Sequence, residues 1–168
     1  MALAPDNWTA WFDRHGAAML MLARQRVVSR ADAEDVVQNA FIRFWKQRAG
    51  VKDSQAYLFR CVQHAAVDFI RSGRRRRARE QAPGQYHATA CEPLFVRDLQ
   101  AAERQARIET ALGHLPAEQR EVLVLKIWAD LTFSQIAAVL DAPLNTVASR
   151  YRYALSALRG ELIEELVP

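Results

Sequence analysis

The chain has 168 residues, and 51% of them are hydrophobic, which argues against global disorder and provides for a sizeable core. Its two cysteines, Cys61 and Cys91, lie far apart without a CxxC pattern, which argues against a zinc site and a disulfide framework. No basic segment followed by an apolar run opens the sequence, and no apolar stretch approaches the ~18 residues of a membrane span. We therefore expect a cytoplasmic protein without membrane insertion.

The net charge of +4 is modest, but positive charge is concentrated in one short segment. Between residues 71 and 79 the chain carries Arg71, Arg74, Arg75, Arg76, Arg77 and Arg79. Such a block repels itself unless an anionic partner is near, and nucleic acid is the commonest such partner. A solvated linker start is the alternative interpretation of this block.

The hydrophobic periodicity is helical almost throughout, and no segment resembles a strand, so we expect an all-α fold. A first amphipathic helix contains the apolar residues from Trp8 to Ala23. A second helix has a complete apolar stripe over residues 33–45, and Ser29 is its expected N-cap. After a loop, Asp53 or Ser54 caps a third helix that runs directly into the arginine block.

The helical pattern fails between residues 81 and 93, where Pro and Gly are scattered among polar residues. We therefore expect two small helical domains, residues 1–80 and 97–168, joined by a flexible linker over residues 81–96. Helicity resumes near Leu99, and Pro116 is expected in the first turn of the next helix.

A helix-turn-helix pattern follows in the second domain. Thr132 can cap a short helix over residues 133–140, residues 141–143 form a tight break, and a longer helix begins at Leu144 or Asn145. The second helix of such a unit enters the DNA major groove with its N-terminal residues. The candidate DNA-contacting residues are Asn145, Thr146, Ser149, Arg150, Arg152 and Tyr153. Val147 and Tyr151 should face the opposite side, and an ordinary helical hairpin is the alternative.

Several aromatic side chains precede the arginine block, and stacking surfaces beside positive charge suit single-stranded or flipped bases. Most of them lie on apolar stripes and are expected to be core. Tyr57, Phe59, Gln63 and His64 lie off or near the edge of the stripe and are better functional candidates. No HExxH, GxSxG, Walker or Rossmann pattern occurs, so we expect no metal, no cofactor and no catalytic residues.

Two sets of segments together resemble one family. Residues 32–46 and 56–71 resemble region two of extracytoplasmic-function (ECF) sigma factors, and residues 115–123, 133–137 and 145–150 resemble their region four. The order and the spacing match, and the resemblance covers nearly the whole chain. It implies an initiation factor that binds core RNA polymerase and directs promoter-specific transcription.

The resemblance also implies roles for matching positions. It implies that the surface which docks on the clamp helices of the largest polymerase subunit contains Asp32, Asp35, Gln38, Phe41 and Trp45. Capture of an unstacked minus-ten base falls to residues 47–55 with Tyr57, Gln63 and His64, and Arg71, Arg74, Arg75, Arg76 and Arg77 hold the adjacent backbone. The helix from Asn145 reads the minus-thirty-five element, and its domain rests on the polymerase flap. An anti-sigma factor is a further candidate partner, and the free chain is expected to be monomeric.

Some positions depart from the family pattern. The family commonly has Asn at His64, Trp at Tyr57, Glu at Gln135, Gly at Asp141 and Asn145, and a basic residue at Ala148. These differences bear on which bases are read and not on the fold.

Two other classes of protein compete with this interpretation. A one-component helix-turn-helix regulator would bind duplex DNA alone, but it has no reason to carry the helix from Asp32 to Trp45. A small helical enzyme acting on nucleic acid would need metal-binding carboxylates from separate helices. The acidic residues at Asp32, Glu34 and Asp35 lie together at one helix start, where they suit the helix dipole instead.

Overall fold

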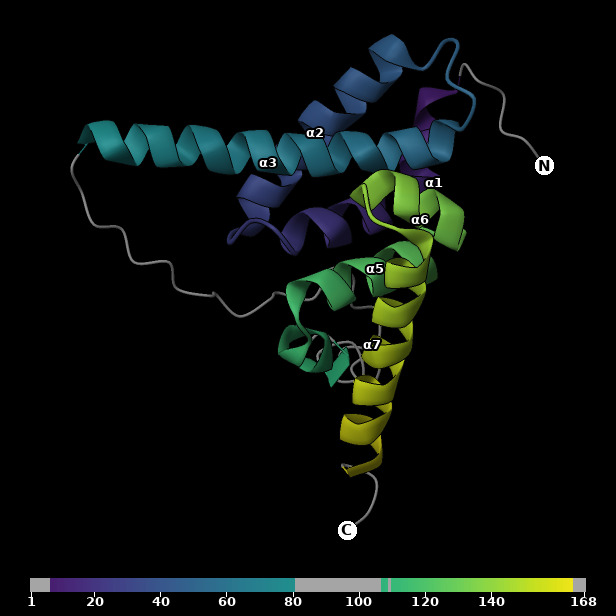
Figure 1. Cartoon of the computed structure of the whole chain (residues 1–168). Coiled ribbons are helices and arrows are strands. Elements are labelled where there is room, and N and C mark those ends of the chain that lie inside the picture. Colours follow the sequence, from purple (N-terminus) through teal and green to yellow (C-terminus); the bar gives the residue numbers. More distant parts are fainter. Residues whose placement is uncertain (1–6, 81–106, 109, 165–168) are drawn as a thin grey trace.

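The computed structural model describes residues 7–80, 107–108 and 110–164, with side chains up to residue 75 in the first range and up to residue 161 in the last. Every regular element in these ranges is helical, which confirms the expected all-α class (Figure 1). The helices are α1 (Trp8–Arg24), α2 (Arg30–Gln47), α3 (Ser54–Glu80), α5 (Ala117–Ile127), α6 (Phe133–Leu140) and α7 (Leu144–Glu164). The predicted linker lies outside the described residues.

Polar side chains fix where four of these helices begin. Asn7, Ser29, Asp53 and Thr132 each accept a hydrogen bond from the backbone N–H three residues further on, at 3.0–3.2 Å. At α6 the side chain of Gln135 also accepts from the backbone N–H of Thr132, at 2.8 Å, which completes a capping box. Each such cap contributes about 1 kcal/mol. The predicted caps at Ser29, Asp53 and Thr132 are therefore confirmed.

Two turns in the second half of the chain are set by single residues. Asp141 ends α6 in the left-handed conformation, with φ 50°, and Ala142 N–H then bonds the Ala137 carbonyl at 3.0 Å. This is a tight C-terminal cap of the kind that usually carries glycine. Pro116 is the N-cap residue of α5 and precedes its first turn, so the prediction that it lies within that turn was wrong by one position.

Helices α1, α2 and α3 form the first bundle, whose fully buried side chains include Met19, Leu22, Phe41 and Phe44. The first half of α3 packs against α1 and α2 within the bundle and also against α6 from the second half of the chain, and it leaves one side with Arg60 and His64 exposed. Phe59 is consequently fully buried, with its ring centroid 6.0 Å from that of His15. The expectation that Phe59 lies off the core was therefore wrong.

Helices α5, α6 and α7 form the helix-turn-helix unit. Val147 is fully buried, as the sequence predicts, and so is Ile136 of α6. Phe133 packs edge-on against Tyr151 at 5.3 Å between ring centroids. A second small core holds Leu112, Leu115, Leu123 and Ala154. Helix α7 extends well beyond α6 toward the C-terminus (Figure 1).

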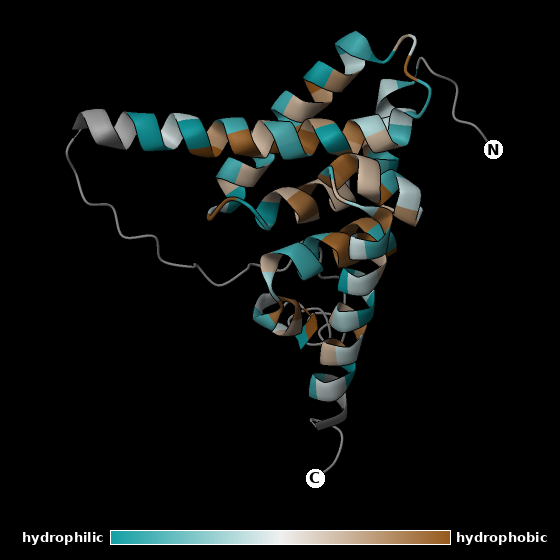
Figure 2. Ribbon diagram, in the orientation of Figure 1, coloured by the Kyte–Doolittle hydropathy of each residue, from teal (hydrophilic) through white to brown (hydrophobic). Residues whose placement is uncertain are grey.

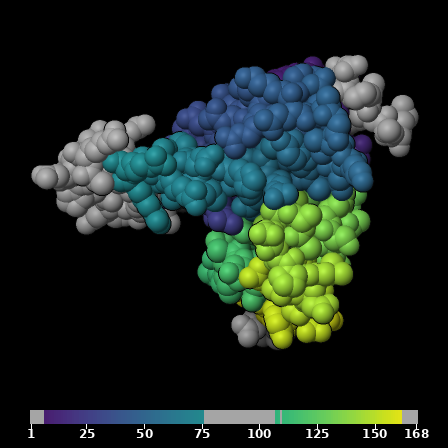
Figure 3. All heavy atoms as spheres, turned by 45° about the horizontal axis from the view of Figure 1, so that its top comes forward, coloured from purple at the N-terminus to yellow at the C-terminus, as the bar shows by residue number. Residues whose placement is uncertain are grey.

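The two bundles pack against each other, which the sequence did not predict. Helix α6 lies against α3, α5 lies against α1, and one hydrophobic cluster is continuous through both bundles. Hydrophobic segments converge on this contact, whereas the far half of α3 is mostly hydrophilic (Figure 2). That half of α3 projects from the body as a free arm (Figure 3).

Candidate promoter and polymerase interfaces

The outer face of α2 is the predicted polymerase-docking surface. Asp35 and Gln38 are exposed on it, Asp32 is half-buried at the N-terminal turn, and Trp45 is half-buried near the C-terminal end. Phe41 is only 1% exposed, so its side chain supports this surface from below and does not form part of it. An acidic first turn is also favourable here because it faces the positive end of the helix dipole.

The sequence missed an aromatic extension of this surface on α1. Trp8 is 44% exposed, and its ring lies edge-on to those of Phe41, at 4.5 Å, and Trp45, at 5.5 Å. Phe12 is similarly exposed and meets Phe41 at 5.5 Å. The apolar periodicity of α1 predicts Trp8 and Phe12 as core residues. Only the tertiary arrangement shows that the apolar side of α1 extends beyond the bundle at these two residues and is exposed there.

The loop between α2 and α3 is braced at both ends. Tyr57 donates a hydrogen bond from its hydroxyl to Gln47 Oε1 at 2.5 Å. Burial raises the pKa of the Tyr57 hydroxyl above its usual value, with the neighbouring Cys61 adding to the shift. Arg48 stacks on the Trp45 ring at 3.6 Å, and Gly50 adopts φ 88°, which favours glycine. A stacked cation beside a braced loop was not predicted from the sequence.

Gln63 and His64 lie on α3 beyond this loop. His64 is exposed and is placed two helical turns from Tyr57 on the same side of α3. Gln63 is only 6% exposed, and its side-chain amide nitrogen has no hydrogen-bond partner in the described structure. Gln63 lies off the apolar stripe in sequence, but its side chain is buried all the same, because α6 and the following turn cover that side of α3.

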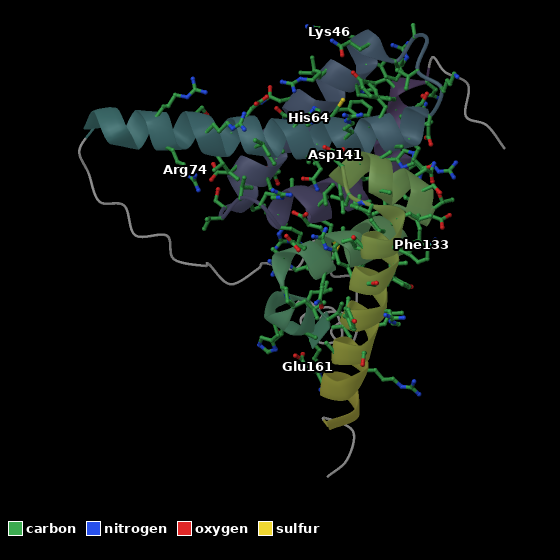
Figure 4. The ribbon with its side chains drawn as sticks, viewed as in Figure 1. Lys46, His64, Arg74, Phe133, Asp141 and Glu161 are labelled. Carbon is green, nitrogen blue, oxygen red and sulfur yellow. The ribbon has the colours of Figure 1, made fainter. Side chains whose placement is uncertain are left out.

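The arginine block lies on the free arm of α3, as the sequence predicts (Figure 4). Arg71, Arg74 and Arg75 are exposed there. Arg76 and Arg77 belong to the same helix, and their side chains lie outside the described ones. Closer to the body, Arg43 pairs with Asp68 at 3.2 Å, so that part of the helix carries less unbalanced charge.

The start of α7 is the predicted reading helix. Val147 is fully buried, and Asn145, Arg152 and Tyr153 are exposed, with Ser149 half-buried among them. Thr146 and Arg150 lie on the side that faces α3. Arg150 Nη2 also pairs with Glu118 Oε2 of α5 at 2.6 Å. The helix therefore presents amide, hydroxyl and guanidinium groups to one exposed side, which are the groups that contact base edges and phosphates.

Within the described residues, no cluster of three or more His, Cys, Asp or Glu side chains is arranged to hold a metal ion. The helices of that part of the chain also include none with the length and apolar character needed to cross a bilayer.

Family comparisons assign both bundles. Residues 11–76 match the model described as Sigma-70 region 2, and residues 105–158 match the one described as Sigma-70, region 4. The ECF RNA polymerase sigma factor SigL of Mycobacterium tuberculosis is 32% identical over 159 residues, which is 92% of this chain and 88% of the relative. The RNA polymerase sigma-E factor of Streptomyces coelicolor is 31% identical over 149 residues, 87% of this chain and 80% of that protein.

Solved structures share the fold of the chain. CnrH, in complex with the cytosolic domain of CnrY, matches with TM-score 0.61 and 26% identity over 94% of this chain and 88% of that chain. The sigma factor RpoE of Bartonella quintana, in complex with the anti-sigma factor NepR, shares the fold at TM-score 0.68 and 21% identity, covering 92% of this chain and 96% of that one.

The chain contains both regions in the family's order, on two helical bundles of which the second is a helix-turn-helix unit. This combination defines a promoter-specificity factor of bacterial RNA polymerase. The chain belongs to the ECF sigma factor family. It is thus an initiation factor that acts with core RNA polymerase at promoters, and the alternative of a one-component regulator is not supported.

Proposed function

We propose a division of labour within this ECF sigma factor. Residues 1–80 dock on core polymerase and open the minus-ten element, residues 97–168 read the minus-thirty-five element, and residues 81–96 join them. The observation that carries the proposal is that the two family regions coincide with the two bundles.

The minus-ten interface comprises the loop from Gln47 to Gln55, with Tyr57 and His64 on the same side of α3 and the arginine arm beyond. Extruding a base costs a few kcal/mol, so a braced loop with aromatic and cationic stacking groups stabilises the opened strand. Arg71, Arg74 and Arg75 hold phosphates of the same strand, and we assign Arg76 and Arg77 the same role. Gln63 acts indirectly, since it is buried beneath this surface.

The minus-thirty-five interface is the start of α7. Asn145 and Arg150 suit base edges, whereas Thr146, Ser149, Arg152 and Tyr153 suit phosphates and the groove walls. Glu118 holds the Arg150 guanidinium in the absence of DNA, and its surface ion pair is weak enough to exchange for a base contact.

Core polymerase docks on α2 through Asp32, Asp35, Gln38 and Trp45, with Phe41 supporting them from within. Reversing the charge at Asp35, which is exposed and at the helix start, should weaken this docking without loss of fold. Asp35→Lys is expected to lose co-elution with core polymerase on a gel-filtration column, while its circular dichroism and unfolding midpoint stay close to those of the wild type. The matched control is Asp13→Lys, on the exposed side of α1. Normal co-elution of Asp35→Lys would show that the docking surface lies elsewhere.

Further properties follow from this function. The factor acts in the cytoplasm, where polymerase and promoters are, and it catalyses no reaction itself. It is monomeric when free, and its exposed aromatic residues Trp8 and Phe12 offer an anti-sigma factor a binding surface, in line with the complex of RpoE with the anti-sigma factor NepR.

A further inference from the structure

A groove runs between α3 and the turn that joins α6 to α7. Its volume is about 490 Å³, which lies within the range of sites for small molecules. The α3 wall carries Arg60, Gln63 and His64, and the opposite wall carries Asp141. Figure 4 shows His64 close to Asp141. The groove is thus a hollow of ligand size with polar groups on both walls.

Charge in the groove is balanced, but not all of it is paired. Three guanidinium groups and three carboxylates line it. Four of these groups form two ion pairs, between Arg26 and Glu121 and between Arg150 and Glu118. The side chains of Arg60 and Asp141 have no hydrogen-bond or ion-pair partner within the described residues. In that part of the chain, the groove therefore offers one unpaired guanidinium and one unpaired carboxylate.

A buried donor in the same groove also lacks a partner. Gln63 lines the groove and is only 6% exposed, and its Nε2 has no hydrogen-bond acceptor in the described structure. Native proteins rarely leave a buried amide N–H without an acceptor, because its desolvation is then uncompensated. Arg60 lies three positions before Gln63, so the two side chains are neighbours on the surface of α3. An anionic group on this wall gains a guanidinium and an amide donor together.

The opposite wall has the complementary charge and an apolar lining. Asp141 ends α6 with φ 50°, a conformation in which glycine is the usual residue, and its exposed carboxylate can accept from a cationic group. Apolar side chains lie on both walls, namely Val67 on α3 and Val139 and Leu140 on α6. The groove therefore suits a molecule with a negative group, a positive group and an apolar part.

We propose that this groove is a binding site for a small zwitterion, an α-amino acid with an apolar side chain. Its carboxylate binds Arg60 and Gln63, its ammonium group binds Asp141, and its side chain packs on the apolar residues of the two walls. A phosphate ester fits less well, because its additional negative charge meets the carboxylates of Glu118 and Glu121 in the same groove.

Occupancy of the groove also affects DNA binding. His64, Thr146 and Arg150 line the groove and are residues that we assign to promoter contacts. A bound amino acid therefore competes with promoter DNA for these side chains. This consequence rests on the promoter roles proposed above, whereas binding of the amino acid to the free chain does not.

The first test measures binding to the free, isotope-labelled full chain by NMR. L-Leucine, L-methionine and L-phenylalanine are each titrated to about 10 mM, which detects dissociation constants in the millimolar range or tighter. At least one of them should shift the Gln63 side-chain amide resonance saturably. No saturable shift with any of the three would overturn the proposal.

Variants and ligand analogues then test the two charged contacts. Arg60→Gln and Asp141→Asn should each weaken binding by about tenfold or more, since each removes a charge-assisted contact. Asparagine tolerates the left-handed conformation, so Asp141→Asn keeps the turn. The control Arg43→Gln removes an ion pair outside the groove and should bind as the wild type does. If leucine is the ligand, isopentylamine and isocaproate, which each lack one of its charged groups, should bind about tenfold more weakly. Unchanged affinity of either groove variant, or equal affinity for either analogue, would overturn the zwitterion site.

The second test measures competition with the promoter. At ten times its dissociation constant, the amino acid should lower transcription by limiting factor with core polymerase about tenfold on genomic fragments of the source bacterium. Transcription by Asp141→Asn, at a residue outside the promoter contacts that we assign, should fall much less. Undiminished transcription by the wild type at saturating amino acid would overturn the competition. Absence of transcription without the amino acid would instead overturn the sigma-factor roles and leave the binding result as it stands.

Discussion

Arg150 is held by an acidic neighbour at the edge of the proposed reading helix. Its pair with Glu118 is at the surface, so that pair contributes at most about 1 kcal/mol and gives way when DNA offers a guanine edge or a phosphate. The same side chain also lines the groove between the bundles. Its availability to DNA therefore depends on how readily this ion pair opens.

Arg150→Ala should lower the use of promoters that depend on the upstream element by about 1–3 kcal/mol, because it removes a base contact. Competition transcription between promoters with and without that element measures the difference. Arg159→Ala, exposed further along α7, is the matched control and should show no such preference. Equal activity of Arg150→Ala on both promoter classes would remove Arg150 from the reading set.

His15 is buried among aromatic rings, 5.1 Å from Trp11 and 6.0 Å from Phe59 between ring centroids. Burial, with a smaller effect of Arg14, lowers the pKa of His15 to about 4. Between pH 6.5 and about pH 4, His15 is protonated in the unfolded chain and neutral in the folded chain. The folded state therefore loses stability as the pH falls through this window.

We expect the free energy of unfolding to drop by about 2 kcal/mol more in the wild type than in His15→Phe between pH 7 and pH 4.5. Urea unfolding of both proteins at the two pH values gives this difference directly, since other titrating groups are shared. Parallel pH profiles would mean that His15 is protonated in the fold.

The sequence predicted the helix N-caps correctly, but it predicted the burial of individual side chains less well. The caps at Ser29, Asp53 and Thr132 depend on side chains three residues from the N–H they satisfy, so the sequence contains all the information. Burial of Phe59 and Gln63 depends on helices far along the chain. The apolar stripe of a single helix predicts which of its residues face its own bundle. It does not predict burial by a second domain that packs on the opposite side of that helix.

At the scale of elements, α3 is one continuous helix with two different environments. Its first half packs against α1, α2 and α6, and its second half projects as a charged arm (Figure 3). The sequence predicts this change, because the apolar stripe stops where the arginines begin. A rigid arm keeps exposed cations at fixed positions along the DNA backbone, which a flexible linker would not do.

The arm gives a prediction about salt. Each phosphate contact contributes about −0.9 to the slope of log affinity against log salt on duplex DNA, and about −0.7 on a single strand. Arg74→Ala with Arg75→Ala should therefore make the slope of promoter binding by the polymerase complex less negative by about 1.4–1.8. Arg107→Ala, at an exposed residue outside the arm, should leave the slope as it is. An unchanged slope in the double variant would show that Arg74 and Arg75 make no phosphate contacts and that the arm is an ordinary solvated helix end.

At the scale of the whole molecule, the sequence predicted both bundles and their order but not their contact. The ion pair between Arg26 and Glu121 joins residues 95 positions apart, and the hydrogen bond from Gln135 Nε2 to Asp53 Oδ2 spans 82 positions. Helical periodicity relates residues that are three and four positions apart, so it cannot predict contacts between residues that are far apart in the sequence. The helix-turn-helix was predictable because its caps, its break and its buried face are all local.

The most direct test of the central claim is to add the purified wild-type chain to core polymerase and map transcription start sites on a genomic fragment library of the source bacterium. The account predicts new, discrete start sites that share one pair of upstream elements and that are absent with core polymerase alone. An unchanged set of start sites, together with duplex DNA binding by the chain without polymerase, would contradict it and favour a one-component regulator.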